Sequence, residues 1–303
     1  MFLTLTEKAQ ANRISPLLPT VAVLVLAAAA WSIYARPLRS DFPAPQTISV
    51  LPDAVSYRQS GEFLKNGMPV DGQLQTVRWP APLMVMKYQV SEREYAFCVG
   101  DGACDALDHT IDAGNDRPVT GVSFLDTEKY SLWLSGKTGQ QWRLPTDQEW
   151  AALAGSKYND DAVGRKQDAA DPSQRWIRQY ETESAKAGLS DPVIHPSGFF
   201  GTNENDLVDL SGNISEWTST CYTRSTLSEN GSVISVIDNC GVRVVEGEHR
   251  AYMTAFIRDA KSGGCSVGTP PDYLGMRLIR EQPGFLWRLW TRLLPEVRID
   301  MKR

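Results

Sequence analysis

The sequence lacks a net positive charge, and no cluster of basic residues occurs in its central part. Its 303 residues include 31 lysines and arginines against 36 acidic residues, which gives a formal net charge of -5 at neutral pH. A surface that binds nucleic acid needs a basic face to replace the counterions of the phosphates. The charge balance therefore argues against nucleic acid as a partner.

Internal repeats and low-complexity tracts are also missing, while hydrophobic residues make up 42% of the chain. A chain of this length and composition can bury a substantial hydrophobic core. We therefore expect a globular fold rather than a repeat array or a disordered protein.

Cysteine is scarce, and its spacing does not suit a zinc site. Zinc sites use tighter cysteine pairs with a second pair of ligands nearby, whereas His109, the histidine nearest to Cys98 and Cys104, stands alone. The turn between these two cysteines is glycine-containing and can bring both sulfurs into disulfide range. Such a disulfide stabilises the fold by about 2 kcal/mol and predicts an oxidising compartment outside the cytoplasm. Three cysteines remain: Cys221, Cys240 and Cys265. Two of them can form a second disulfide and one is left over, but the sequence does not show which two pair.

The amino end carries a long uncharged segment. Residues 14–35 contain no charged side chain, and a helix of about 22 residues is long enough to cross a hydrocarbon core of about 30 Å. Its length favours an uncleaved membrane anchor, with Trp31 and Tyr34 at the interface. The competing interpretation is a cleavable signal with a small-residue site at 28–30, which would release the protein to the periplasm. With the anchor retained, we expect a single-pass membrane protein with a periplasmic domain.

The division of the chain follows from these features. A linker marked by prolines follows the anchor, and an amphipathic stretch with tryptophans and arginines ends the chain, either lying in a membrane interface or packing as a terminal helix. We expect residues 1–13 as a cytoplasmic leader, 14–35 as the anchor or signal, 36–47 as the linker, 48–281 as the folded domain, and 282–303 as the amphipathic tail.

Short strands and capped helices are expected within the domain. Strand-like runs cover 48–51 and 83–90. Three capping boxes open helices, and a glycine follows each helix as its stop signal. These pairs and stops are Ser91 with Glu94 before Gly100, Ser123 with Asp126 before Gly136, and Thr146 with Glu149 before Gly155.

An ordered series of motifs runs through this domain. It consists of Pro118–Phe124, Trp133–Ser135, Thr138–Gly139, Arg143–Trp150, Asp206–Asp209, Gly212–Trp217 and Gly275–Arg280. As a set, the series resembles the formylglycine-generating enzyme domain, also called the sulfatase-modifying factor domain, over most of residues 48–281. The resemblance implies an α+β fold related to C-type lectins, with little regular secondary structure and often with bound calcium.

The resemblance also implies a calcium site. Its ligands in this chain would be the side chains of Asp209 and Glu216 and the backbone carbonyls of Gly212 and Ile214. Oxygen ligands with two carboxylates suit a hard cation. The alternative is that both acids are turn and cap residues around a tight turn at 212–213. The tryptophans and the arginine of the motifs are expected to pack and to hydrogen-bond in the core rather than to bind substrate: Trp142, Trp150, Trp217 and Arg143.

The usual catalytic metals lack their ligands. Formylglycine-generating enzymes bind copper(I) through two cysteines, as soft ligands should, and the corresponding positions are Tyr252 and Ile257. A related iron branch uses an H-x3-H-x-E pattern that the three histidines do not form: His109, His195 and His249. Copper and iron are therefore not supported, and whether the chain is an enzyme stays open.

A charged segment remains where the copper ligands would be. Glu246, Glu248, His249 and Tyr252 could form a relocated metal or acid/base site, or they could be a solvated loop. The resemblance extends to extracytoplasmic family members that lack both metal sites and act in pyoverdine maturation or beside copper nitrite reductases. The 98–104 loop and the segments 239–247 and 263–265 are most similar to the nitrite-reductase accessory type. We therefore expect a periplasmic accessory protein with a protein client; the alternative is a metal-dependent oxidase.

Overall fold

The computed structural model describes residues 42–112, 114–160, 177, 180–181, 193–255 and 270–281. The predicted leader, anchor and tail lie outside these residues, as do Ile257 and Cys265. Within the described ranges, no helix is long and apolar enough to span a bilayer.

The domain is a mixed α+β structure, as the family resemblance implies, in which strands are short except for one hairpin. Its strands are β1 (Thr47–Val50), β2 (Val55–Arg58), β3 (Glu62–Lys65), β4 (Met68–Val70), β5 (Leu74–Val77), β6 (Leu83–Met86), β7 (Trp142–Arg143), β8 (Ser215–Leu227), β9 (Val233–Glu246), β10 (Ala251–Thr254), β11 (Leu274–Gly275) and β12 (Ile279–Arg280). Its helices are α2 (Glu92–Gly100), α3 (Phe124–Thr138), α4 (Asp147–Ala154) and the 3-10 turn η1 (Gly155–Lys157).

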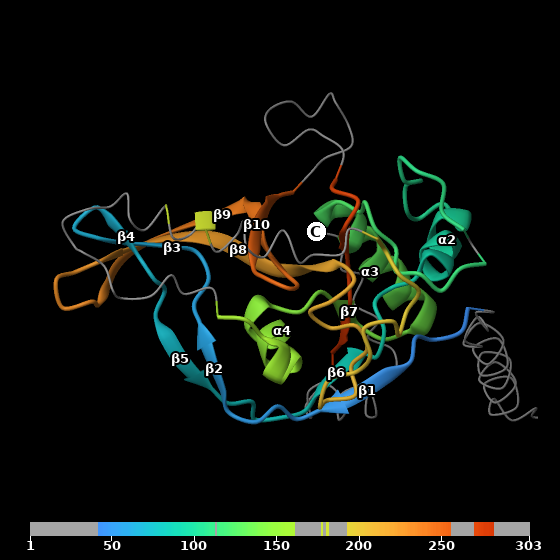
Figure 1. Ribbon diagram of the computed structural model, residues 1–303. Helices are drawn as coiled ribbons and strands as arrows, with labels where there is room; N and C mark the ends of the chain where they lie inside the picture. The colour runs from blue at the N-terminus through green and yellow to red at the C-terminus, as the bar shows by residue number, and fades with distance from the viewer. Residues whose placement is uncertain are drawn as a thin grey trace, which may run out of the picture. The chain divides into compact units, whose positions relative to one another are not determined.

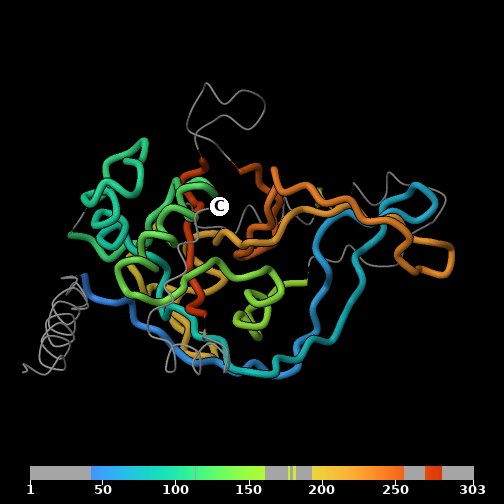
Figure 2. Tube along the Cα trace, turned by 180° about the vertical axis from the view of Figure 1, so that it is seen from behind, coloured from blue at the N-terminus to red at the C-terminus, as the bar shows by residue number. Residues whose placement is uncertain are grey.

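Segments far apart in sequence form the sheets. One sheet has the order β1-β6-β12-β7, and the other runs β10-β9-β8-β3-β4, with β11 added beside β8. A separate ribbon pairs β2 with β5. In Figure 1, the β8–β9 hairpin extends toward β3 and β4, and α4 packs against β2, β8 and β9. The same ribbon of β2 and β5, drawn in blue and cyan, can be followed from behind in Figure 2.

All three predicted capping boxes are present. Each N-cap side chain accepts the N3 backbone N–H, and each N3 carboxylate accepts the N-cap N–H. The predicted stop at Gly136 is wrong, because α3 continues to Thr138. It ends instead at Gly139, whose φ of 66° is the left-handed conformation that closes a helix without a side-chain penalty. The strand predicted over 83–90 is also shorter, since β6 ends at Met86.

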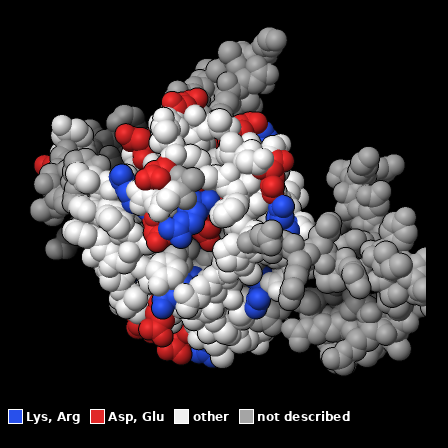
Figure 3. Space-filling view, turned by 90° about the vertical axis from the view of Figure 1, so that its right-hand side faces the viewer, with Lys and Arg blue, Asp and Glu red and all other residues white. Residues whose placement is uncertain are grey.

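The motif tryptophans lie in the core. Trp142, Trp150 and Trp217 are all buried, which confirms their packing role. Phe42, which lies in the segment expected as a linker, joins this core by an edge contact with Trp133 at 4.9 Å between ring centroids. On the face shown in Figure 3, acidic and basic side chains are interspersed among uncharged ones.

Two disulfides cross-link the domain. The predicted pair Cys98–Cys104 is confirmed, with 5.3 Å between the Cα atoms. Cys221 and Cys240 form the second disulfide across the β8–β9 hairpin, with 4.5 Å between the Cα atoms. Of the three cysteines whose pairing the sequence leaves open, Cys221 and Cys240 are therefore the two that pair. It lies at an irregular point in the strand register, where Cys221 faces Arg243 but the next residue of β8 already faces Asn239.

Candidate functional site

Three motifs meet at the carboxylate of Glu216, which is fully buried at the start of β8. Arg277, next to β11, donates to it at 3.0 Å. The indole Nε1 of Trp150 on α4 donates to the other oxygen at 2.9 Å. Gln89, which follows β6, donates its amide N–H at 2.9 Å. Both oxygens of Glu216 thus accept hydrogen bonds, as a buried carboxylate requires.

The guanidinium of Arg277 ties this junction to the neighbouring backbone. It donates to the carbonyl of Met86 at 3.1 Å, of Lys87 at 2.7 Å and of Val208 at 2.7 Å. A planar guanidinium can serve several acceptors at once, so one side chain joins β6, β8 and the 206–209 motif. Gly275, two residues before Arg277, has no room for a side chain, because a Cβ there would lie 2.5 Å from the carbonyl oxygen of Val119.

Arg143 has a structural role, as predicted. Two of its nitrogens each donate at 2.7 Å to the carboxylate of Glu149, and it also pairs with Glu281. Burial alone would raise the pKa of Glu149, but its hydrogen bonds and ion pair with Arg143 outweigh burial and lower it. Glu149 therefore stays ionised while it completes the capping box of α4.

The predicted calcium ligands use their carboxylates for N–H groups. The oxygens of Asp209 accept the backbone N–H of Gly198 at 2.5 Å and of Phe200 at 2.8 Å. Glu216 is paired with Arg277, and the carbonyl of Gly212 accepts the N–H of Ile214 at 2.8 Å. Calcium binds oxygen ligands at about 2.3–2.6 Å and takes six to eight of them. As placed, this donor set does not fit the ion, because N–H groups already face both carboxylates.

The charged segment before β10 does not converge on one point. Glu246 is buried and pairs with Arg250 at 2.8 Å, whereas Glu248 and His249 are exposed. Within the part of the chain that the structure describes, histidine, cysteine and acidic side chains form no group of three that could hold a metal ion. Tyr252 lies further along, on β10, and its hydroxyl accepts the N–H of Gly61 at 2.8 Å.

A polar cleft lies beside this segment, between the β2–β5 ribbon, the start of α4 and β8. Its volume is about 340 Å³, at the small end for ligand sites. Amides, hydroxyls and one carboxylate line it: Tyr57, Gln59, Ser60, Gln75, Thr146, Asp147, Gln148, Thr220 and Thr223.

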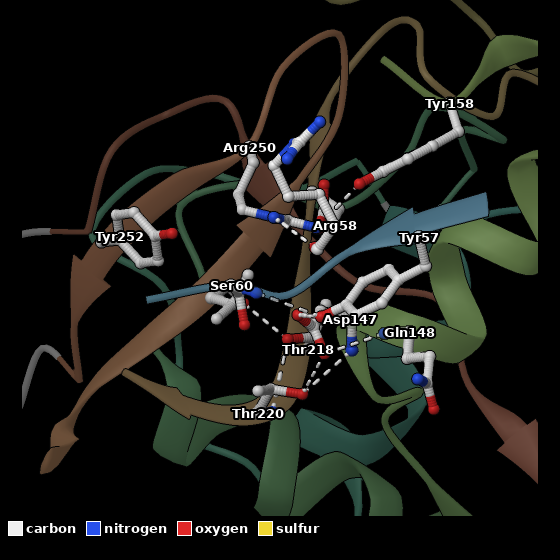
Figure 4. A network of polar contacts seen from close by, with 12 residues as sticks. Tyr57, Arg58, Ser60, Asp147, Gln148, Tyr158, Thr218, Thr220, Arg250 and Tyr252 are labelled. Carbon is white, nitrogen blue, oxygen red and sulfur yellow. Dashed lines mark hydrogen bonds and ion pairs between the residues drawn. The ribbon is translucent and has the colours of Figure 1, made fainter. Parts of the chain in front are cut away.

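Tyr57, Asp147 and Thr220 point toward one another at the floor of the cleft (Figure 4). The Tyr57 hydroxyl donates to Asp147, and Thr220 Oγ1 donates to the second carboxylate oxygen at 2.8 Å. Burial and the neighbouring negative charge of Asp147 raise the pKa of Tyr57. The tyrosine therefore stays protonated and acts as a fixed donor rather than as a base.

Arg250 forms a wall next to this floor. Its guanidinium lies 5.4 Å from the centre of the Tyr57 ring and donates to the hydroxyl of Tyr158 at 3.1 Å. Burial raises the pKa of Tyr158 to about 12, although the positive charge of Arg250 opposes the rise. The cleft thus presents mostly neutral hydrogen-bonding groups. Its one carboxylate, Asp147, accepts from two hydroxyls, and the neighbouring Arg250 is paired with Glu246.

Sequence reasoning missed the residues of this floor. Asp147 belongs to the motif Arg143–Trp150, where the sequence indicates only the start of a helix. Tyr57 carries no local signal, because its partner is 90 positions away. A buried Tyr–Asp pair of this kind is recognised only from the folded structure.

Solved structures with a similar fold have low sequence identity to the chain. PvdO from Pseudomonas aeruginosa is 20% identical, with a TM-score of 0.51, and the match covers 78% of this chain and 95% of PvdO. The Treponema denticola variable protein 1 is 15% identical, with a TM-score of 0.45 and coverage of 78% and 95%. CarF is 17% identical, with a TM-score of 0.40 and coverage of 78% and 98%. The likeness to PvdO shows the fold alone.

The family comparison covers most of the chain. No curated protein sequence matches it. The family described as the sulfatase-modifying factor enzyme 1-like domain matches residues 36–282, a span that includes every motif whose residues meet at Glu216. The chain belongs to this family.

Proposed function

We propose that this chain is an accessory protein that binds a client outside the cytoplasm and does not use copper chemistry at the usual family position. The observation that carries the proposal is Tyr252, which stands at the first of the two cysteine positions. Its hydroxyl is engaged by the N–H of Gly61, and its ring packs edge-on against Tyr222 at 5.2 Å. Copper(I) prefers thiolates, and this phenol fastens β10 to the start of β3 instead.

The location outside the cytoplasm is supported by the two disulfides, which persist in oxidising compartments. The uncharged segment 14–35 supports a single membrane anchor with the domain on the periplasmic side. Cleavage of that segment as a signal would leave the same domain free in the periplasm.

The polar cleft supports client binding. It is open, and its amide and hydroxyl groups can donate to and accept from a partner. For the client, we propose a metalloenzyme of the copper nitrite reductase class, on the strength of the sequence likeness around 98–104 and 239–247.

The test is binding of a purified copper nitrite reductase to the chain with both Gln75 and Gln148 changed to alanine. Each glutamine lines the cleft and neither is buried. Losing two hydrogen bonds worth about 1 kcal/mol each should weaken affinity roughly 30-fold. Titration calorimetry measures this change directly.

The matched control is Gln140→Ala, an exposed glutamine outside the cleft that bonds Arg280 at 3.0 Å. Its affinity for the client should stay that of the wild type. If the wild type and both variants bound the client with equal affinity, the cleft would not be the binding site. If the wild type did not bind, copper nitrite reductase would not be the client.

A further inference from the structure

Three oxygens converge on one buried point beside the Glu216 junction, and a nitrogen occupies that point. Gln89 Nε2 lies 2.9 Å from Glu216 Oε1. The same nitrogen lies 3.5 Å from the backbone carbonyl oxygens of Asp209 and Gly212. Gln89 is 3% exposed and Glu216 is fully buried, so the amide and this carboxylate are shielded from water. Two of the four predicted calcium ligands, Gly212 and Glu216, are therefore near each other but face an amide.

We infer that the Gln89 amide takes the place of a cation at this junction, which is closed without a bound metal ion. The charge of Glu216 is already compensated by Arg277, at 3.0 Å. A divalent ion at bonding distance from Glu216 would displace the amide and lie close to the guanidinium, whose positive charge repels it. The other predicted carboxylate, Asp209, holds the 198–200 backbone instead.

The orientation of the amide distinguishes the two states of such a junction. With the nitrogen toward the three oxygens, Gln89 Oε1 is buried and has no hydrogen-bond partner among the described residues. The reverse orientation would set this oxygen against three other acceptors with no proton between them. Only a bound cation would favour that reverse orientation. The cation would then have four oxygen ligands, namely Gln89 Oε1 and the three oxygens that now face the amide nitrogen. Calcium dependence of stability therefore reports which arrangement the protein adopts.

The experiment compares the melting temperature of the full chain in EDTA and in excess calcium. The wild type should melt at the same temperature in both buffers. If the site bound calcium, a free calcium concentration of about 100 times the dissociation constant would raise the melting temperature by roughly 5 °C or more. Such a rise in the wild type would overturn the inference.

Two variants at the same position sharpen the comparison. Gln89→Glu places a second carboxylate against Glu216, so it should melt lower in EDTA and recover in calcium. Gln89→Met removes the N–H without adding charge, so it should melt lower in both buffers. A calcium response in Gln89→Met equal to that of Gln89→Glu would contradict the assignment. Gln140→Glu, on the surface, is the control for added charge and should not respond. If neither Gln89 variant folds, the wild-type comparison alone decides.

Discussion

Replacing Arg277 with methionine should lower the free energy of unfolding by about 3–5 kcal/mol, since it leaves the carboxylate of Glu216 buried without its cation. The change also removes the donors to three backbone carbonyls that join β6 to the 206–209 motif. Methionine keeps most of the side-chain length, so the loss reports charge and hydrogen bonding more than volume. Urea denaturation measures the difference.

Two further variants distinguish loss of the Arg277–Glu216 ion pair from a general effect of removing an arginine. Arg280→Met takes away a nearby arginine that bonds exposed Gln140, and it should change stability by less than about 0.5 kcal/mol. In the double variant with Glu216→Met, the buried unpaired charge is gone, so the total loss should be smaller than the sum of the two single losses. Additive losses would contradict the pairing.

Removing the second disulfide should cost about 3 kcal/mol, the chain-entropy value for a loop of its length. Cys221 and Cys240 are 19 positions apart, and their bond spans the irregular register of the β8–β9 hairpin. The variant Cys221→Ser with Cys240→Ser should therefore be less stable in urea under non-reducing conditions. Its hairpin, which is exposed from 233 to 241, should also be cut faster by protease.

The shorter disulfide provides the comparison. Cys98→Ser with Cys104→Ser opens a loop with a sequence separation of 6, so the expected loss is nearer 2 kcal/mol. In this variant, the protease sensitivity of the β8–β9 hairpin should be that of the wild type. If the 221–240 variant were as stable and as protease-resistant as the wild type, the disulfide would not hold the hairpin.

Local features of the fold could be predicted from the sequence. The three capping boxes lie within four residues each, so the sequence alone shows both partners. The predicted end of α3 is wrong because Gly136 and Gly139 are both plausible stops. The sequence does not show that the left-handed conformation is adopted at Gly139. The β8–β9 hairpin was not predicted, because β9 is exposed on both faces over 233–241 and lacks the alternation that marks a half-buried strand.

The junction at Glu216 could be predicted only in part. The motifs named Trp150, Glu216 and Arg277, but their order along the chain does not show that all three side chains meet. Arg277 is 61 positions from Glu216, and the ion pair that this buried arginine forms with the expected metal ligand has no local signal in the sequence. The cleft depends in the same way on long-range contacts, such as Tyr57 with Asp147.

Metal analysis of the purified full chain tests the central claim most directly. An accessory protein whose family cysteine positions hold Tyr252 and Ile257 should contain no stoichiometric copper or iron, even after incubation with either metal under reducing conditions. Stoichiometric copper or iron that is lost on changing Glu248, His249 or Cys265 would contradict the account and identify a metal-dependent oxidase.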